Sequence, residues 1–149
     1  MEPWLAGKHA DLDPLRRLLA CSLDHALADL RRWTPPEPNP DLSFHLRHIA
    51  GSVDRLWTYA LGAQLEAIQL AYLAAENQGP GHRDELLAAV AEVFDRVQTQ
   101  LRMLEDLDYR EPRYVGRQRV EVPLGLLLGH IAEHTQRHTG QVIALAKTK

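Results

Sequence analysis

The sequence predicts an all-α protein that folds as a four-helix bundle. Four stretches of the chain carry apolar residues at intervals of three and four, which is the spacing of one face of an α-helix. Residues that break helices separate these stretches. Residues 120–122 alternate like a short extended piece, but no convincing second strand accompanies them. Amphipathic helices bury their apolar faces against one another, and four of them most simply form a bundle.

The first helix is expected from about Asp13 to Trp33. Asp13 has the side chain of a helix N-cap, and Pro14 suits the first helical position. Residues 34–40 contain four prolines and end this helix, because proline lacks the backbone N–H that a helix interior requires. We therefore expect a long, stiff Pro-rich crossover to the second helix. The residues expected to face inward are Leu15, Leu18, Leu19, Leu23, Ala26, Leu27 and Leu30.

The second helix is expected from about Ser43 to Leu61, and Gly62 is placed to cap its C-terminus. Residues 63–76 have helical propensity, so the connection to the third long helix is expected to contain a short extra helix. Residues 77–81 hold two glycines and a proline and break the helical pattern.

The third long helix is expected from about Asp84 to Leu104. Residues 105–122 are polar and rich in arginine, and they read as a connection. The last helix is expected to begin near Pro123 and to end at about Ala146. This helix contains three of the eight histidines of the chain.

Composition limits the partners of the protein. The chain has 149 residues and is expected to form one domain, residues 1–149. Its net charge is -3 with both signs mixed, which lacks the basic stripe of a nucleic-acid-binding protein. No apolar stretch reaches the length of a membrane span, and residues 1–4 lack the features of a signal peptide. We expect cytoplasmic residence, with neither nucleic acid nor membrane as a partner.

Cys21 is the only cysteine. An intrachain disulfide is therefore impossible, and a zinc site built on several thiolates is excluded. Free cysteine is usually buried, so Cys21 is expected to be a small core residue.

Three histidines recur at a spacing of four on the last predicted helix: His130, His134 and His138. Residues four apart lie on the same helix face, so two neighbouring imidazoles can point at one metal ion. His130 and His138 are about 12 Å apart along the helix axis, too far for both to bind one ion at about 2 Å. One neighbouring pair is therefore expected to bind, and the spacing does not choose which pair.

A third ligand must come from another helix, and His45 and His48 on the second helix are the main candidates. Helical periodicity favours His45, which lies about 40° from the inward residue Ile49, whereas His48 lies about 100° away. The neighbours of His48 favour the other choice, because Gly51 and Ser52 leave room beside its ring. The remaining candidates are His9, His25 and His82.

The alternative to a metal site is that the histidines form an ordinary polar helix face. Glu133, Gln136 and Arg137 surround the histidine pair and suit a solvated surface equally well.

Two motifs resemble those of the DinB-like family, also called DinB/YfiT-like. They are residues 44–50, Phe-His-Leu-Arg-His-Ile-Ala, and residues 134–141, His-Thr-Gln-Arg-His-Thr-Gly-Gln. The opening Glu-Pro-Trp-Leu of residues 2–5 and the Pro-rich crossover are similar to one branch of that family. The resemblance covers essentially the whole chain and implies a four-helix bundle that acts as a metalloenzyme.

The resemblance also implies a ligand set. The family's metal triad is one histidine of the second helix and the HxxxH pair of the fourth, which fall on His48, His134 and His138. His45 and His130 would then pack around the ligands. Many members have a further histidine where this chain has Arg137, and a guanidinium there could suit an anionic ligand.

Activities known in the family are thiol S-transfer, mycothiol-dependent isomerisation and metal-dependent hydrolysis, and members commonly form homodimers. We expect a divalent-metal-dependent enzyme that activates a low-molecular-weight thiol for transfer to an electrophile. The alternatives are a metal-dependent hydrolase, a non-catalytic bundle in which the metal links two helices, and a helical interaction protein without a metal. Histidine ligands suit Zn, Ni, Fe and Cu, so the metal stays open. Asp54, Glu133 and Gln141 are candidates to orient the ligating rings.

Overall fold

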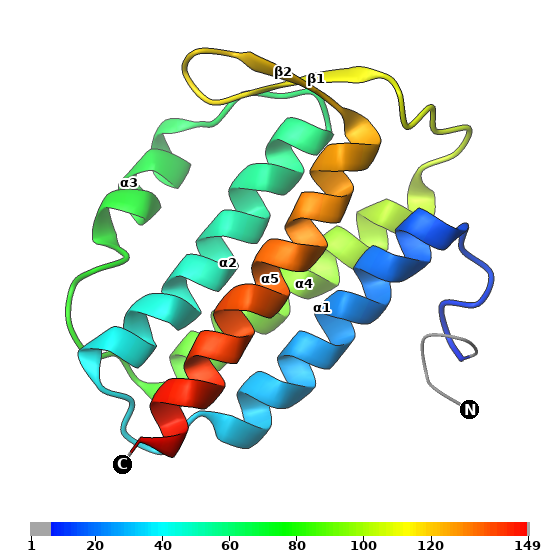
Figure 1. The fold of residues 1–149 in the computed structure, drawn as a ribbon. Helices are drawn as coiled ribbons and strands as arrows, with labels where there is room; N and C mark the ends of the chain where they lie inside the picture. Colours follow the sequence, from blue (N-terminus) through cyan, green and yellow to red (C-terminus); the bar gives the residue numbers. More distant parts are fainter. Residues whose placement is uncertain (1–6, 149) are drawn as a thin grey trace.

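The computed structural model describes residues 7–148, and its four long helices form the predicted bundle (Figure 1). Each of α1 and α2 packs against both α4 and α5, so the four helices make a square in cross-section. The prediction of an all-α bundle is confirmed. The long helices are α1 (Pro14–Trp33), α2 (Pro40–Ala60), α4 (Arg83–Met103) and α5 (Leu124–Lys147).

Side chains from all four helices fill the core. Trp57 of α2 and Phe94 of α4 are the largest fully buried side chains, and each stabilises the fold by roughly 1.5–3 kcal/mol through burial. Cys21 is buried among them, as predicted. Leu18 was expected to face inward but is 55% exposed, because the buried stripe of α1 centres on Leu19 and Leu23.

The starts of α1 and α2 follow one rule. Asp13 accepts hydrogen bonds from the backbone N–H groups of the first turn of α1, as predicted. Asn39 caps α2 in the same way, with Pro40 at the first helical position. The predicted start at Ser43 was therefore three residues late. Gly62 follows the C-terminus of α2 with a φ of 84°, the left-handed conformation that suits the predicted cap.

A short helix, α3 (Ala67–Ala75), lies in the connection between α2 and α4, as predicted. Glu66 and Gln69 form a reciprocal capping box at its start. Figure 1 shows α3 beside α2, on the outside of the bundle. Within Ala67–Ala75 no residue is buried, so α3 is an appendage of the core.

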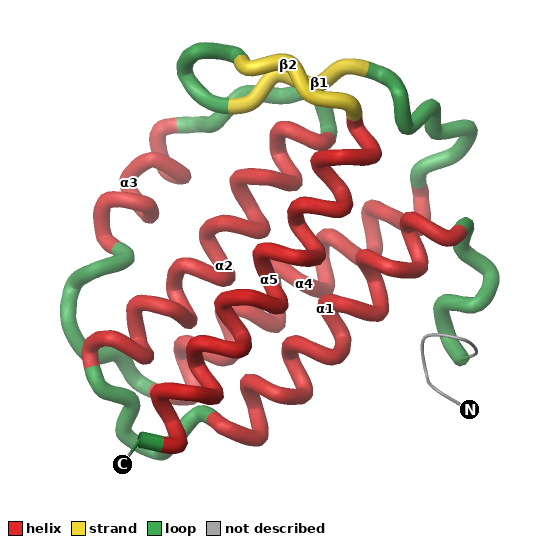
Figure 2. The backbone as a smooth tube through the Cα atoms, viewed as in Figure 1, coloured by secondary structure: helices red, strands yellow, loops and turns green. Residues whose placement is uncertain are grey.

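A two-stranded hairpin closes one end of the bundle, and the expectation that no second strand would accompany residues 120–122 was wrong. Strand β1 (Pro112–Val115) pairs antiparallel with β2 (Val120–Pro123), as Figure 2 shows. Arg113 donates a hydrogen bond to the carbonyl oxygen of Ala60 at 2.7 Å, which ties the hairpin to the end of α2. Pairing and this contact stabilise a strand that its local sequence does not predict.

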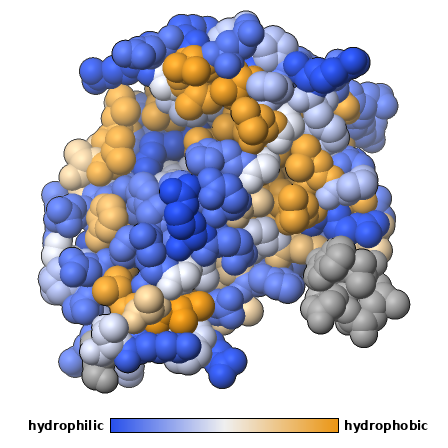
Figure 3. Space-filling view, viewed as in Figure 1, coloured by the Kyte–Doolittle hydropathy of each residue, from blue (hydrophilic) through white to orange (hydrophobic). Residues whose placement is uncertain are grey.

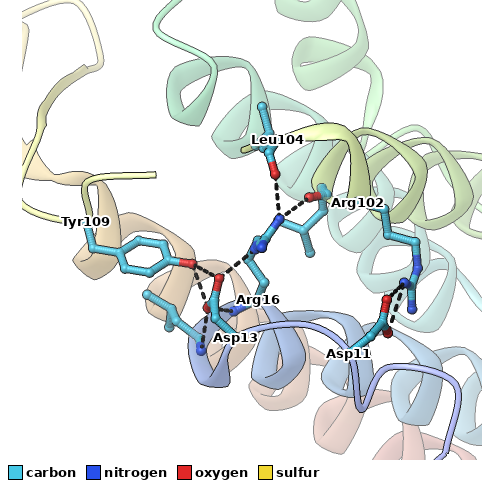
Figure 4. Close-up of polar contacts among 8 residues, drawn as sticks. Asp11, Asp13, Arg16, Arg102, Leu104 and Tyr109 are labelled. Atoms are coloured by element: carbon cyan, nitrogen blue, oxygen red, sulfur yellow. Dashed lines mark hydrogen bonds and ion pairs between the residues drawn. The ribbon is translucent and has the colours of Figure 1, made fainter. Parts of the chain in front are cut away.

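The connection before the hairpin is fastened to the start of α1 (Figure 4). Tyr109 donates its hydroxyl hydrogen to the Asp13 carboxylate, whose two oxygens lie at 2.6 and 2.7 Å. Arg16 donates to the same carboxylate at 2.6 Å and to the carbonyl oxygen of Leu104 at 2.6 Å. One carboxylate therefore joins the cap of α1 to the segment that follows α4.

Hydrophilic residues cover the middle of the face on which α5 lies (Figure 3). Glu133, Gln136 and Arg137 on α5 are exposed. Across the described residues, no helix has both the length and the apolar character to span a membrane. The motif of residues 2–5 that supported the family resemblance lies outside the described part of the chain.

Candidate metal centre

Three histidines converge between the facing helices α2 and α5. One ring nitrogen from each of His48, His134 and His138 lies within 4.8 Å of the other two. The ring centroids of His134 and His138 are 4.4 Å apart, and that of His48 lies 4.5 Å from His138 and 5.2 Å from His134. All three side chains are half-buried. The structure thus brings together the three histidines that the resemblance implies.

Local sequence explains how the rings meet. His134 and His138 are one turn apart on α5 and point the same way. His48 approaches from α2, where the following turn carries the small residues Gly51 and Ser52, both buried.

The other histidines lie outside this cluster. His130 lies one turn before His134 on α5, and its side chain is 43% exposed. Its Nδ1 lies 3.1 Å from a Glu133 oxygen. His45 is adjacent to the cluster, with its Nδ1 3.2 Å from Nδ1 of His138. His9 is buried and contacts Asp24 of α1 at 2.6 Å. His25 and His82 are exposed.

Burial and neighbouring charge favour the neutral form of the His134 and His138 rings. Burial lowers the pKa of His134 to about 4, with a further contribution from the charge of His48. Burial and the charge of His48 likewise lower the pKa of His138 to about 4. A neutral imidazole has a lone pair available for a metal ion, whereas the protonated ring has none.

The donor set fits a divalent ion. Nitrogens around a tetrahedral ion at about 2.1 Å are roughly 3.4 Å from one another. The ring nitrogens of the three histidines lie within 4.8 Å of one another, so binding an ion would bring any two of them closer by at most about 1.4 Å. Three such ligands leave a coordination position for another molecule.

A model of one protein family matches most of the chain. Its description is the DinB superfamily, and the match covers residues 12–142. The chain belongs to the DinB superfamily. Neither the search of curated proteins nor that of solved structures gives a significant match. A metal-binding function fits both this DinB membership and the histidine cluster.

The residue that contacts the outer side of His48 in this DinB protein is one that the sequence did not suggest. An oxygen of Glu76 lies 3.0 Å from Nδ1 of His48, and its other oxygen accepts a hydrogen bond from Arg55 at 2.7 Å. Burial raises the pKa of Glu76, but the bonds from His48 and Arg55 outweigh it, so the pKa is lowered. Glu76 is 28 residues from His48 in the chain, and no spacing rule links them.

The residues expected to orient the rings have other partners. Asp54 accepts hydrogen bonds from Arg96 at 2.7 Å and from Gln69 at 2.9 Å. Glu133 accepts one from Arg137 at 2.9 Å, so the guanidinium is paired at the surface and is not free at the mouth of the site. Gln141 is exposed on α5.

A surface hollow of about 270 Å³ lies beside the cluster. His45 lines the hollow and also contacts His138, so it connects the two. Phe44, another lining residue, stacks on the His48 ring with a centroid distance of 5.4 Å. The remaining lining residues are Asp41, Asn77 and Leu145.

Proposed function

We propose that the protein is a divalent-metal-dependent enzyme in which His48, His134 and His138 hold the ion. The observation that carries the proposal is the convergence of three imidazole nitrogens beside an open hollow. We further propose that the enzyme activates a small thiol and transfers it to an electrophile.

The donor set supports this chemistry. Neutral histidine ligands leave the ion its full charge, and a thiol bound to it would be held as the reactive thiolate. In the transfer step the thiol loses its proton to solvent, its sulfur forms a bond to the electrophilic carbon, and the leaving group departs with its electron pair. The protein contributes the position of the thiol and a place for the electrophile.

The hollow suits an electrophile with an apolar part. Phe44 and Leu145 supply an apolar wall, while Asp41 and Asn77 supply polar groups. Such a mixture is typical of small-molecule sites, in which apolar contacts give affinity and a few polar groups set the orientation.

A thiol panel tests the proposal. The purified protein is loaded with Zn²⁺, Ni²⁺ or Fe²⁺ and given small thiols together with a chlorinated dinitrobenzene. Formation of the thioether, with loss of chloride, is followed by absorbance. We expect acceleration that His134→Ala and His138→Ala abolish. The matched control is His130→Ala on the same helix, which should retain the rate. Equal rates with wild type and with the His134 and His138 variants would refute thiol transfer, and cleavage of a nitrophenyl ester by the loaded protein alone would favour the hydrolase.

The second candidate function is a structural metal that joins α2 to α5. It is favoured by the distribution of the ligands over two helices that already pack together. Circular dichroism with a chelator distinguishes the two roles. Loss of helix on metal removal would indicate a structural metal, and an intact helical signal would indicate an open functional site.

Formation of a homodimer and residence in the cytoplasm stay predictions, which sedimentation and cell fractionation would check.

A further inference from the structure

We infer that Glu76 is a positioning residue of the metal site and that it couples metal binding to the docking of residues 61–82. The inference rests on the metal site of the proposed function, though not on the transfer reaction. Glu76 directly follows α3, in the connection between α2 and α4.

The burial of Glu76 needs an explanation. Its side chain is 2% exposed, whereas Ile68, Leu70 and Leu73 on the preceding helix are each at least 45% exposed. Burying a carboxylate costs several kcal/mol unless partners compensate for its lost hydration. The charged side chain of Glu76 is therefore buried in the bundle, whereas the apolar side chains just before it in the chain are exposed to solvent.

The partners of Glu76 account for this burial. One oxygen faces Nδ1 of His48 at 3.0 Å, and the other faces Nη1 of Arg55 at 2.7 Å. The Arg55 side chain is only 11% exposed, so this is an internal ion pair. Gly51 provides the space, because a Cβ atom there would collide with the Glu76 carboxylate.

The contact determines which nitrogen of His48 is available. An ionised carboxylate only accepts hydrogen bonds, so the proton of a neutral His48 ring must be on Nδ1. Nε2 then carries the lone pair that an ion would bind, and the Ser52 hydroxyl oxygen lies 3.2 Å from it. Because Arg55 occupies the other oxygen, the carboxylate cannot turn away from His48 without losing its ion pair.

The position of Glu76 in the chain extends this effect to a whole segment. Residues 61–82 are also held by a hydrogen bond from Arg47 to the carbonyl oxygen of Gly79 at 2.6 Å and by one from Gln69 to Asp54 at 2.9 Å. Opening of the segment withdraws Glu76 from His48. Coupling between two events is reciprocal, so metal binding must oppose that opening as strongly as opening weakens metal binding.

The test compares two isosteric variants. In Glu76→Gln the amide cannot accept from both His48 and Arg55, so one contact is lost. In Asp54→Asn the same segment loses the carboxylate that holds Gln69, whereas the contacts of His48, His134 and His138 do not involve Asp54. Removing a partner of a metal-bound histidine typically weakens metal binding about 10–100-fold. We expect a loss in that range for Glu76→Gln in a Zn²⁺ competition titration and less than about a twofold change for Asp54→Asn.

Hydrogen exchange provides the second readout. In wild type, saturating Zn²⁺ should slow exchange of the amides of α3 and its C-cap by about the same 10–100-fold, and Glu76→Gln should remove this slowing. Equal Zn²⁺ affinity of Glu76→Gln and wild type would overturn the inference. An equal loss in both variants would also overturn it, because general loosening of the segment would then explain the effect.

Wild-type protein alone provides a test that does not depend on how the variants fold. Nitrogen NMR of the metal-free protein should show His48 protonated on Nδ1, and protonation on Nε2 would overturn the inference. Failure of the proposed function has a different signature. If the protein binds Zn²⁺ through Glu76-oriented His48 but transfers no thiol, the reaction is refuted and the positioning role stands.

Discussion

Replacement of Gly51 by alanine should destabilise the protein, although the same change usually stabilises a helix. Gly51 lies inside α2. Alanine is favoured over glycine in a helix interior by about 1 kcal/mol. A Cβ atom at this position would overlap the Glu76 carboxylate and would lie 2.6 Å from Nη1 of Arg55 and 2.8 Å from Cε1 of Tyr72. Either Glu76 must leave its place or the helix must shift.

The two effects can be weighed against each other. Breaking a buried ion pair costs about 3–5 kcal/mol, and the lower end, roughly 3 kcal/mol, applies because the side chains of Arg55 and His48 are still 11% and 20% exposed. Subtracting the helical gain of about 1 kcal/mol leaves a net loss of roughly 2 kcal/mol. For a chain of this size, that loss lowers the midpoint temperature of thermal unfolding by about 4–8 °C.

Gly129→Ala is the matched control. Gly129 is inside α5, and a Cβ atom there would have no neighbour within 4 Å. Urea unfolding followed by circular dichroism should show Gly129→Ala stabilised by up to about 1 kcal/mol and Gly51→Ala destabilised by roughly 2 kcal/mol. Stabilisation of both variants would refute the close fit of Glu76 against α2.

Three further predictions concern the contact between Tyr109 and Asp13, the binding of metal, and the dependence of stability on pH. Tyr109→Phe removes a hydrogen bond to the Asp13 carboxylate and should cost about 1–2 kcal/mol in urea unfolding. Burial raises the pKa of Asp13, but the hydrogen bonds from Tyr109 and Arg16 outweigh it and lower the pKa overall. The stabilisation from these bonds is therefore lost as the carboxylate is protonated, and the cost of Tyr109→Phe should shrink below about pH 4. Zn²⁺ at 100 times its Kd should raise the free energy of unfolding by about 2.7 kcal/mol in a thermal shift assay, and His138→Ala should show no such rise. Metal-free protein should lose stability as pH falls from about 6.5 to about 4, because the folded pKa values of His134 and His138 are near 4 and the unfolded chain therefore binds more protons in that range. Stability that stays constant between pH 7 and pH 4 in acid titration would contradict this.

Local signals were sufficient for the helices and insufficient for the hairpin. The cap and proline at Asp13 and Pro14 predicted the start of α1, and the same pair at Asn39 and Pro40 would have corrected the start of α2. Strand β1 is four residues long and begins with proline, so its own sequence favours no strand. Its structure comes from pairing with β2 and from contact with α2, which are not local properties.

The histidine cluster was partly predictable. Spacing on α5 left open whether His130 or His138 pairs with His134, and periodicity on α2 favoured His45. The family resemblance implied His48, His134 and His138, and the ring nitrogens of these three do meet. Glu76 could not be predicted, because its contact with His48 depends on how a 22-residue connection, residues 61–82, folds back onto α2.

The exposure of α3 makes it a convenient site for a reporter. Cys21, the single cysteine, is 8% exposed, and burial together with the charge of Asp24 raises the pKa of its thiol. Thiol reagents need an accessible thiolate, so Cys21 should react slowly. Ile68 is 75% exposed, and an Ile68→Cys variant would accept one fluorophore on α3 without entering the core. The emission of such a labelled protein would follow the docking of the connection in real time, so the protein could serve as a sensor of free metal.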